Sequence, residues 1–292
     1  MKIQEIENEF EEAYQNCVSE FKSFELLRKI ALVIAIILEL ALCWCIYKLS
    51  GITYHLKPYI ILLALMFGVW SFCKRVVEFT IKEMVMDSFL KSFGDLKWTS
   101  DDVLSKDEIK SSLIFPSFNP VEFYSLDNIV GTFNKNEMSI SDVTLKKGFG
   151  LYSCTVFKGL AIKFSLSKNF EGRTIIVEKD FHLFSTLNAV KLEDIEWSSK
   201  FNVYSNNQVE ARYILTPALM EQIKALKKLY RAKRIAFSFE NNSVIIALDI
   251  GGRMFETCSL LSKIENKKQW ELMFFKIYYI LRLNNLFNDR CL

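Results

Sequence analysis

The residues best suited to acid–base, nucleophilic or metal chemistry are few and scattered. The chain of 292 residues has two histidines, at positions 55 and 182, and seven cysteines, at positions 17, 43, 45, 73, 154, 258 and 291. Cys154 or Cys258 could pair with His182 as nucleophile and base. However, Phe181 and Phe184 flank His182, which is more typical of a partly buried structural histidine. We therefore find no catalytic or metal-binding group among the histidines and cysteines.

Phosphate-binding and acidic motifs are not recognisable either. The glycines at positions 148, 150, 159, 251 and 252 do not have the spacing of a phosphate-binding loop. The acidic clusters at 101–102 and 193–196 are more typical of solvated loops than of a metal site. We predict that the protein is not an enzyme and uses no metal or cofactor.

One carboxylate has an unusual setting. Glu39 lies near the middle of the apolar run IALVIAIILELALCWCIY, residues 30–47, which contains no other charge. An ionised carboxylate inside a bilayer costs about 2.5–3.5 kcal/mol. If this run crosses a membrane, Glu39 either takes part in ion or proton transport, or is protonated and hydrogen-bonded. Its hydrogen-bond partner would then lie in a neighbouring membrane helix of the same chain or in another subunit.

A basic cluster follows later, in KALKKLYRAKR, residues 224–234. Lys224, Lys227, Lys228 and Arg231 lie at helical spacing beside an apolar line. In a domain attached to a membrane, each charge could gain about 1 kcal/mol from anionic lipid. The alternative is an ordinary solvated helix face.

Two apolar runs indicate how the chain is attached. Residues 30–47 and 55–73 are each long enough to cross a bilayer as a helix, and a short loop joins them. This arrangement predicts a transmembrane hairpin rather than buried core helices or a cleaved signal peptide. Basic residues are more frequent outside the hairpin than in its loop, which predicts that both termini lie in the cytoplasm.

The overall charge and the cysteine count agree with that location. The formal net charge of +3 is small and no basic stripe is evident, so nucleic acid is not an expected partner. An odd number of cysteines argues against a fully paired disulfide framework and favours a reducing compartment.

The segments that flank the apolar runs are predicted to be amphipathic helices, 1–29 and 74–94. Apolar residues recur in both at steps of three or four. The two helices could pair as a cytoplasmic stalk, or associate with a second copy. A third alternative, that they lie flat on the bilayer, is opposed by the acidic character of the first helix.

Residues 95–292 are predicted to form an α+β domain with a largely antiparallel sheet and two helices, 217–231 and 264–287. Two hairpins are expected, one joining FNVYS to QVEARYIL at Asn206 and one joining RIAFSFE to SVIIALD at Asn241 and Asn242. The other strands expected are IVGTF, YSCTVF, GLAIKFSLS and TIIVEK.

The segment 201–223 changes its period at Leu215. The alternation before it predicts a strand whose core face holds Val209, Ala211, Tyr213 and Leu215. After it, Thr216 is suited to cap a helix and Pro217 to its first position.

The opposite face of that strand supplies a candidate contact to a protein partner. Glu210 and Arg212 are two residues apart and close enough to pair, and Tyr204 lies on the preceding strand. An exposed pair of this kind contributes only about 0–1 kcal/mol to stability. Binding is therefore the functional interpretation left for Arg212, Glu210 and Tyr204.

A family resemblance is carried by SSLIFPSF (111–118), DNIVGTF (127–133), residues 157–180 and residues 190–223, with EARY followed by LTP as the most specific part. FSFENNSVIIALD and the later Met254, Phe255 and Glu256 continue it. Over roughly residues 70–260, the chain resembles a family of bacterial membrane proteins grouped as domain of unknown function 3137. The resemblance implies a multi-pass protein of the bacterial cytoplasmic (inner) membrane, with a two-span anchor and a cytoplasmic domain. It also implies a LemA-type membrane protein as a candidate partner. Family members commonly have an aspartate near Asn207, so a role for that carboxylate does not carry over.

We therefore expect an uncharacterised, noncatalytic, membrane-tethered binding or scaffold module. Its expected partners are the lipid bilayer and either a protein or a second copy of the chain. The alternative is a subunit of a transport or envelope-maintenance assembly that uses Glu39 within the bilayer.

Overall fold

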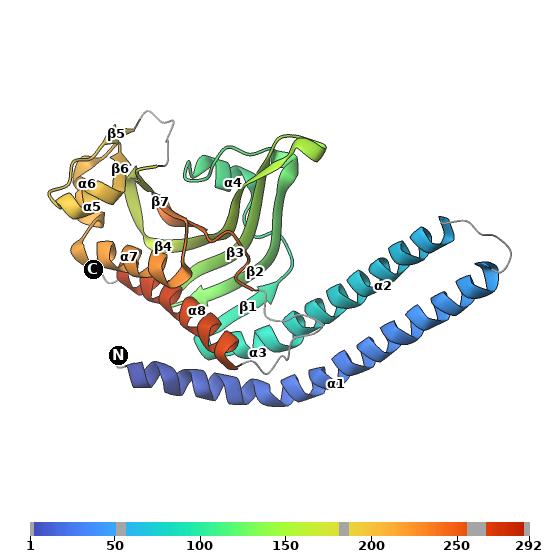
Figure 1. The fold of residues 1–292 in the computed structure, drawn as a ribbon. Coiled ribbons are helices and arrows are strands. Elements are labelled where there is room, and N and C mark those ends of the chain that lie inside the picture. The colour runs from blue at the N-terminus through green and yellow to red at the C-terminus, as the bar shows by residue number, and fades with distance from the viewer. Residues whose placement is uncertain (1–2, 51–56, 181–186, 256–266, 289–292) are drawn as a thin grey trace. The chain divides into compact units, whose positions relative to one another are not determined.

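The computed structural model describes residues 3–50, 57–180, 187–255 and 267–288 (Figure 1). The chain divides into two compact units. The first comprises Met1–Ser92 and Glu256–Trp270, and the second comprises Phe93–Phe255 and Glu271–Leu292.

The first unit is an antiparallel pair of helices. Helix α1 (Ile3–Ser50) lies beside α2 (Lys57–Ile81), which runs in the opposite direction (Figure 1). A π-helical turn, η1 (Lys82–Met86), and the short helix α3 (Asp87–Leu90) follow α2. The 3-10 turn η2 (Lys91–Phe93) follows.

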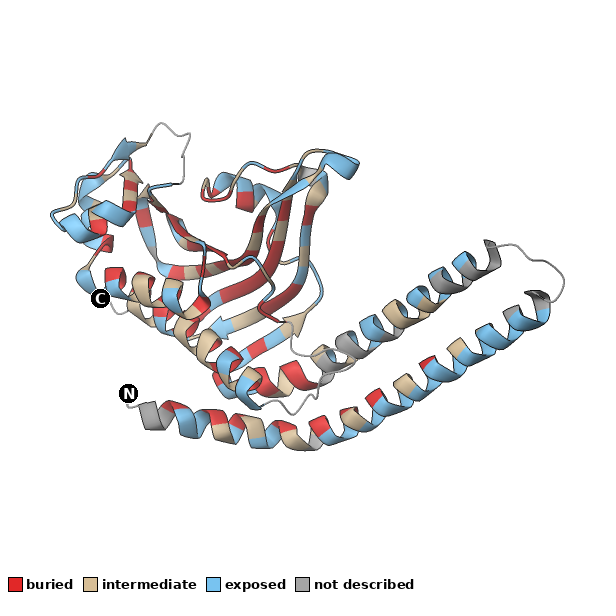
Figure 2. Ribbon diagram, in the orientation of Figure 1, coloured by how far each residue is buried: buried red, intermediate tan, exposed pale blue. Residues whose placement is uncertain are grey.

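The first half of α1 buries the stripe that its spacing predicts. Buried apolar residues recur along it, and Figure 2 shows buried positions in red along the helix. They are Ile6, Phe10, Ala13, Cys17, Phe21 and Phe24. They face η1 and α3, where the Ser88 hydroxyl donates to Glu20 Oε1 at 2.6 Å. Trp270 joins this core, with its ring 5.1 Å from those of Phe21 and Phe89.

The second half of α1 has a different surface. Large apolar side chains are exposed around it, among them Ile36, Ile37, Leu40 and Trp44. Within the described part of the chain, no helix has the length and apolar character needed to cross a membrane. The predicted transmembrane hairpin is therefore not supported. Both predicted spans, 30–47 and 55–73, include residues whose side chains lie outside that description, such as Ile46.

The second unit is an α+β domain with an antiparallel sheet, as predicted. In the described residues seven strands pair in the order β1-β2-β3-β4-β6-β5, and β7 pairs with β4. The strands are β1 (Asp95–Thr99), β2 (Phe123–Phe133), β3 (Asn136–Lys147), β4 (Cys154–Glu178), β5 (Asn188–Ala189), β6 (Phe201–Ser205) and β7 (Arg234–Asp249). The helices are α4 (Lys106–Ser111), α5 (Ile195–Lys200), α6 (Gln208–Ile214), α7 (Pro217–Tyr230) and α8 (Lys267–Asn288), with 3-10 turns η3 (Pro120–Glu122) and η4 (Gly150–Tyr152).

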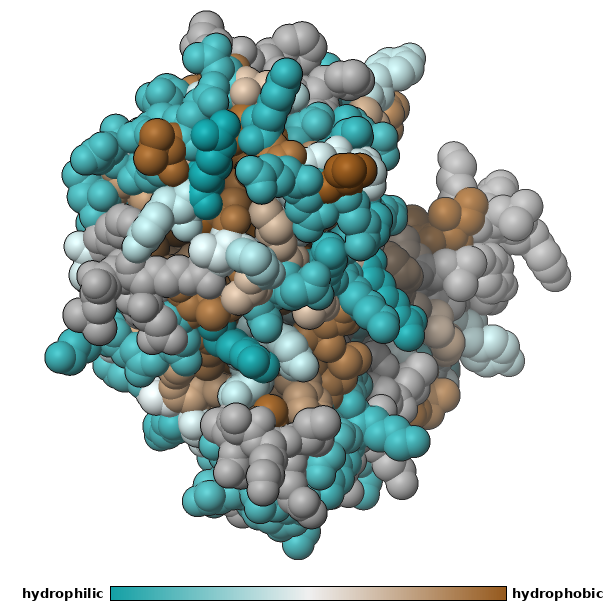
Figure 3. All heavy atoms as spheres, turned by 90° about the vertical axis from the view of Figure 1, so that its left-hand side faces the viewer, coloured by the Kyte–Doolittle hydropathy of each residue, from teal (hydrophilic) through white to brown (hydrophobic). Residues whose placement is uncertain are grey.

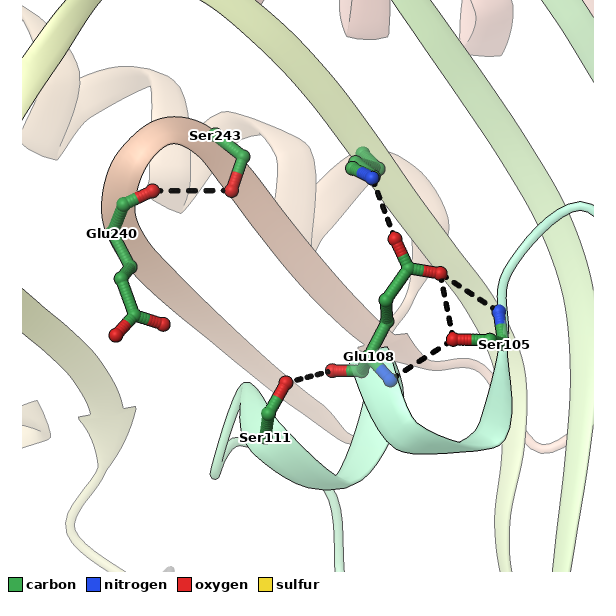
Figure 4. Close-up of polar contacts among 6 residues, drawn as sticks. Ser105, Glu108, Ser111, Glu240 and Ser243 are labelled. Atoms are coloured by element: carbon green, nitrogen blue, oxygen red, sulfur yellow. Dashed lines mark hydrogen bonds and ion pairs between the residues drawn. The ribbon is translucent and has the colours of Figure 1, made fainter.

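Strand β7 folds back on itself. Its 16 residues would measure about 50 Å if straight, yet the Lys233 amide beside its start donates to the Asp249 carbonyl at its end at 2.7 Å. Asn241 has a φ of 52°, and Figure 4 shows the chain reversing between Glu240 and Ser243. The hairpin predicted at Asn241 is therefore confirmed.

Strand β4 bends around that hairpin. Its residues 159–165 pair with 243–249, and its residues 174–177 pair with 236–239. The register is irregular between Ser165 and Thr174, where β4 turns, and Figure 1 shows its curved path. The predicted strands YSCTVF, GLAIKFSLS and TIIVEK all belong to this one strand.

The two faces of the sheet are covered differently. One face carries an apolar cluster that includes Leu104 and Ile109, beside and within α4. On the other face, Phe287 of α8 contacts Phe164 and Phe239 at ring distances of 5.9 and 5.7 Å.

The hairpin predicted at Asn206 is wrong, because QVEARYIL forms helix α6. Asn207 caps this helix by accepting a hydrogen bond from the Glu210 amide at 3.1 Å. Ala211 is buried as predicted, but Val209 and Tyr213 are 77% and 61% exposed. Alternation over so few residues does not separate a strand from a short helix, and an Asn cap decides for the helix.

Candidate anion-binding site on α7

A cavity of about 570 Å³ lies in the second unit, between the end of β4, the junction of α5 with β6, and helix α7. Figure 3 views the side of the domain on which α5 and α6 lie, and hydrophilic side chains cover most of its upper half. The described residues that line the cavity are Glu178, Lys179, Asp180, Ser199, Lys200, Phe201, Lys224, Lys227, Lys228 and Ala232.

Helix α7 presents its lysines because its other face is buried. Thr216 caps the helix by accepting from the Leu219 amide at 3.4 Å, and Pro217 takes the first position, as predicted. The side chains on the core face are buried: Leu219, Met220, Ile223, Leu226 and Tyr230. Lys224, Lys227 and Lys228, at steps of three and four, therefore share the opposite side and line the cavity.

Three carboxylates contact two of these lysines. Lys227 Nζ lies 2.6 Å from Glu178 Oε2, while Glu178 Oε1 accepts from the Ile235 amide at 2.9 Å. Lys224 donates to Glu221 at 3.0 Å and lies 3.8 Å from Glu196. The hydrogen bond to Glu221 raises the pKa of Lys224 above its ordinary value, so this ammonium stays charged at neutral pH.

Phe201 contributes an apolar side chain to the lining of the cavity. Phe201 begins β6, and its ring stacks on that of the fully buried Trp197 with centroids 4.2 Å apart. Asp194 fixes α5 by accepting from the Trp197 amide at 2.9 Å. The Lys200 ammonium, at the end of α5, donates to Glu196 at 3.0 Å. This hydrogen bond lowers the pKa of Glu196 below its ordinary value.

Lys179 and Lys228 provide the surplus positive charge. Both are exposed, and neither side chain has an ion pair or hydrogen bond with the described residues. Five lysines line the cavity against two carboxylates. The arrangement can bind an anion, because several ammonium groups converge on a concave surface.

The structure separates Arg231 from the other predicted lipid contacts. Lys224, Lys227 and Lys228 line the cavity together, whereas Arg231 ends α7 in the left-handed conformation, with a φ of 49°. Sequence reasoning missed Lys179 and Lys200. Lys179 directly follows β4, and Lys200 directly precedes β6. The two lysines come together only because β4 pairs with β6 at Glu178 and Phe201.

The three residues predicted to contact a protein partner, Arg212, Glu210 and Tyr204, have different surroundings in the structure. Glu210 does not pair with Arg212; its carboxylate accepts from the backbone amides of Glu171 and Gly172 at 3.0 Å each. Tyr204 is partly buried and packs against the apolar cluster. Arg212 is exposed on α6, and it stays a predicted contact.

Asn207 has a structural explanation. Its side chain caps α6, and Asn and Asp are about equally good in this position. The aspartate expected there from the family resemblance would serve the same cap.

Glu39 is half-buried on α1. The described residues provide no hydrogen-bond partner for its carboxylate. Both interpretations of Glu39 therefore stay predictions.

The residues considered for catalysis are not brought together in the described part of the structure. Cys154 is exposed at the start of β4, while His182 and Cys258 lie outside the described residues. The described His, Cys, Asp and Glu side chains form no group that could hold a metal ion.

A second cavity, of about 420 Å³, lies over β2, β3 and β4. Lys163 is the cation among the described residues that line it, and it donates to Glu108 at 2.6 Å. Partial burial raises the pKa of Glu108, but hydrogen bonds from Lys163 and Ser105 outweigh this effect and lower it overall (Figure 4). Because its cation is already paired, this cavity is a weaker anion site than the one on α7.

Comparisons with known proteins agree with the family resemblance. No curated protein matches the chain. A crystal structure of the mycobacterial trehalose monomycolate transport factor A, TtfA, is similar, with 14% identity and a TM-score of 0.39 over 68% of this chain and 90% of that one. A TM-score and an identity this low do not support an inference about the function of this chain.

A family model described as "Protein of unknown function (DUF3137)" matches residues 155–288. The match begins in β4 and ends in α8, and it includes the whole of α7 and its cavity. SSLIFPSF and DNIVGTF lie before it. Residues 155–288 are therefore similar to the DUF3137 family of proteins of unknown function.

Proposed function

We propose that the protein is a membrane-attached, noncatalytic binding module that holds a phosphate-bearing anion in the cavity on α7. The observation that carries this proposal is the convergence of five lysines on one cavity with two carboxylates. Lysine ammonium groups are compact charges with three donors and bind phosphate as point charges.

The ligand that fits this proposal is the headgroup of an anionic lipid. Lys179 and Lys228 are exposed at the cavity and unpaired within the described residues, so a headgroup at a membrane surface could reach them. Each lysine near an anionic surface contributes about 1 kcal/mol. A soluble phosphate compound has the same chemistry and is separated from lipid by experiment.

The apolar surface of the first unit supports membrane attachment. Large side chains exposed on α1 and α2 include Leu40 at 63%, Trp44 at 63% and Phe67 at 74%. Exposing a large apolar side chain to water rather than burying it costs about 1.5–3 kcal/mol. In this proposal the membrane is the bacterial cytoplasmic membrane, and both termini lie in the cytoplasm.

The test measures ligand retention by the full-length protein in detergent, using native mass spectrometry. The probes are short-chain phosphatidylglycerol, short-chain phosphatidylcholine and inorganic phosphate. Wild type is compared with the double variant Lys179→Glu/Lys228→Glu. Lys97→Glu, on an exposed position of β1 away from the cavity, serves as the surface-charge control.

We expect phosphatidylglycerol to bind in preference to phosphatidylcholine. The double variant should lose about tenfold or more in affinity, since two favourable charges become unfavourable, whereas Lys97→Glu should bind as wild type. Equal binding by the double variant and Lys97→Glu would refute the cavity as the site. Binding of phosphate without preference for the anionic lipid would refute the lipid ligand.

A further inference from the structure

The turn between β3 and β4 exposes three large apolar side chains. Phe149 is 75% exposed, Leu151 101% and Tyr152 93%. Val121, which precedes β2, is 73% exposed. Single exposed apolar residues are common, but several together usually mark an interaction site.

The backbone of this turn has a defined shape. The Tyr152 amide donates to the Phe149 carbonyl at 3.1 Å, and the Ser153 amide to the Gly150 carbonyl at 3.2 Å. Gly148 has a φ of 103° and would meet the Tyr152 carbonyl at 2.5 Å if it carried a Cβ. Backbone groups therefore bond within the turn, while the apolar side chains project from it.

Val121 belongs to the same end of the sheet. The Asn119 amide donates to the Lys146 carbonyl at 2.9 Å, and Phe123 lies opposite Leu145 in the sheet. We call Val121 together with Phe149, Leu151 and Tyr152 the apolar tip.

Cations flank the apolar tip. Lys146 and Lys147 lead directly into the turn, and Lys146 Nζ lies 5.4 Å from the centre of the Tyr124 ring. On the other side, the Lys106 ammonium of α4 lies 5.9 Å from the Phe123 ring. The end of the sheet thus combines a projecting apolar group with positive charge beside it.

The surroundings of the apolar tip favour lipid as its occupant. A bilayer adapts to a projecting shape, and Lys146 and Lys147 beside the turn complement an anionic surface. The apolar cavity lined by Phe170, Tyr213, Leu219 and Phe239 is small, about 30 Å³, and the cavity on α7 is lined mostly by charged side chains. Neither of these two cavities suits Leu151 or Phe149 of a second copy.

We propose that the apolar tip inserts into the boundary between headgroups and acyl chains of a bilayer that contains anionic lipid. Leu151 and Phe149 enter the apolar layer, to a depth of about 5–10 Å. Tyr152, as an aromatic residue with a polar end, lies at the interface. Lys146 and Lys147 contact lipid phosphates.

This contact rests on the proposed membrane attachment, which brings a bilayer within reach, but it uses no residue of the cavity on α7. It adds a second membrane contact, made by the sheet domain itself. The apolar tip would restrict how the domain turns above the bilayer surface.

The test uses the full chain reconstituted in vesicles, with one environment-sensitive fluorophore. All cysteines except the buried Cys17 are replaced by serine, and the label is attached through Leu151→Cys. Lys135→Cys, at the turn that joins the other ends of β2 and β3, is the matched control. Brominated lipids then report the depth of each label.

We expect headgroup-proximal bromines to quench the label at position 151 and not the label at position 135. Quenching at position 151 should weaken when phosphatidylcholine replaces phosphatidylglycerol, and also in Lys146→Glu/Lys147→Glu. Lys179→Glu/Lys228→Glu should leave it unchanged.

The outcomes separate the two proposals. A protein that does not float with the vesicles refutes membrane attachment. A protein that floats while the label at position 151 stays unquenched, or is quenched only as much as the label at 135, refutes the inserted tip alone. Crosslinking from position 151 to a second copy, without quenching, would make the occupant another chain rather than lipid.

Discussion

The two halves of α1 belong to one continuous helix and yet have opposite surfaces. In the first half, apolar side chains form one stripe, which is buried against α3, η1 and Trp270. In the second half, apolar side chains occur all round the helix, and those at Ile36, Ile37 and Leu40 are more than half exposed.

This difference in surface shows what each half of α1 needs in order to be stable. An amphipathic stripe needs one apolar partner, and the chain supplies it. A helix that is apolar on all sides needs an apolar surrounding, and the described residues cover only part of its surface. The proposal of membrane attachment assigns the rest to lipid, and four experiments can break or sharpen this comparison.

The largest expected effect is the loss of the Phe21 ring. Phe21→Ala removes contacts with Trp270 and Tyr14, at ring distances of 5.1 and 5.5 Å, and should destabilise the first half of α1 by about 3–5 kcal/mol. Leu26→Ala, at a 61% exposed position of the same helix, should cost far less. Amide hydrogen exchange in detergent measures both, and equal losses would contradict the buried stripe.

A charge in the second half should have the next largest effect. Ile37→Asp should cost about 2.5–3.5 kcal/mol if this position lies in hydrocarbon, because the ionised carboxylate loses its hydration there. Fractionation of cells should then show less protein in the membrane. Leu26→Asp is the control in the first half and should not alter the membrane fraction; a similar loss in both variants would remove the distinction between the halves.

Cysteine reactivity compares the halves without disturbing them. Burial raises the pKa of the Cys17 thiol to about 12, and Glu20 adds to the shift. At pH 9 only about one thousandth of Cys17 is thiolate, so a maleimide should modify it far more slowly than the exposed Cys43 in detergent. In intact membranes Cys43 should become protected while Cys17 does not change, and rapid labelling of Cys17 would contradict its burial.

The raised pKa of Cys17 also determines how the stability of the fold changes with pH. Between the ordinary thiol pKa of 9.0 and about 12, the folded state binds more protons at Cys17 than the unfolded state does. The stability contributed at this position is therefore complete below about pH 9 and falls as the pH rises toward 12.

The smallest expected effect is that of Glu39→Gln, which keeps the size and the hydrogen-bonding capacity of the side chain. If Glu39 is a protonated, hydrogen-bonded carboxyl, the variant should keep its oligomeric state and its membrane fraction, as crosslinking and fractionation would show. A proton-dependent activity that disappears in this variant would favour the transport-subunit alternative.

Sequence patterns predicted elements well where a cap or a long period was present. Thr216 and Pro217 fixed the start of α7, and Asn241 fixed the β7 hairpin. α6 was misread because its seven residues also alternate, and its signal was the cap at Asn207. Strand β3 was missed because its apolar residues are interrupted by Ser139, Ser141 and Asp142, all of which are buried in the sheet.

Only the part of the candidate site that lies on α7 could be predicted from the sequence. The lysine spacing of α7 placed Lys224, Lys227 and Lys228 on one face. Lys179 and Lys200 reach the cavity through strand pairing between distant segments, which no local pattern records. The apolar tip was not predicted, because three apolar residues beside glycines resemble the end of a buried strand.

The nesting of β7 within β4 has a consequence for synthesis. Gly159 can pair with Val143 of β3 early, but its pairing with Asp249 of β7 must wait until that residue has been made. Pairing between such distant segments is slow. The helices of the first unit precede both strands on the ribosome and need no part of the sheet to form their pair. The helix pair should therefore form while the sheet is still incomplete, and the sheet should be completed only after residue 249 has been made.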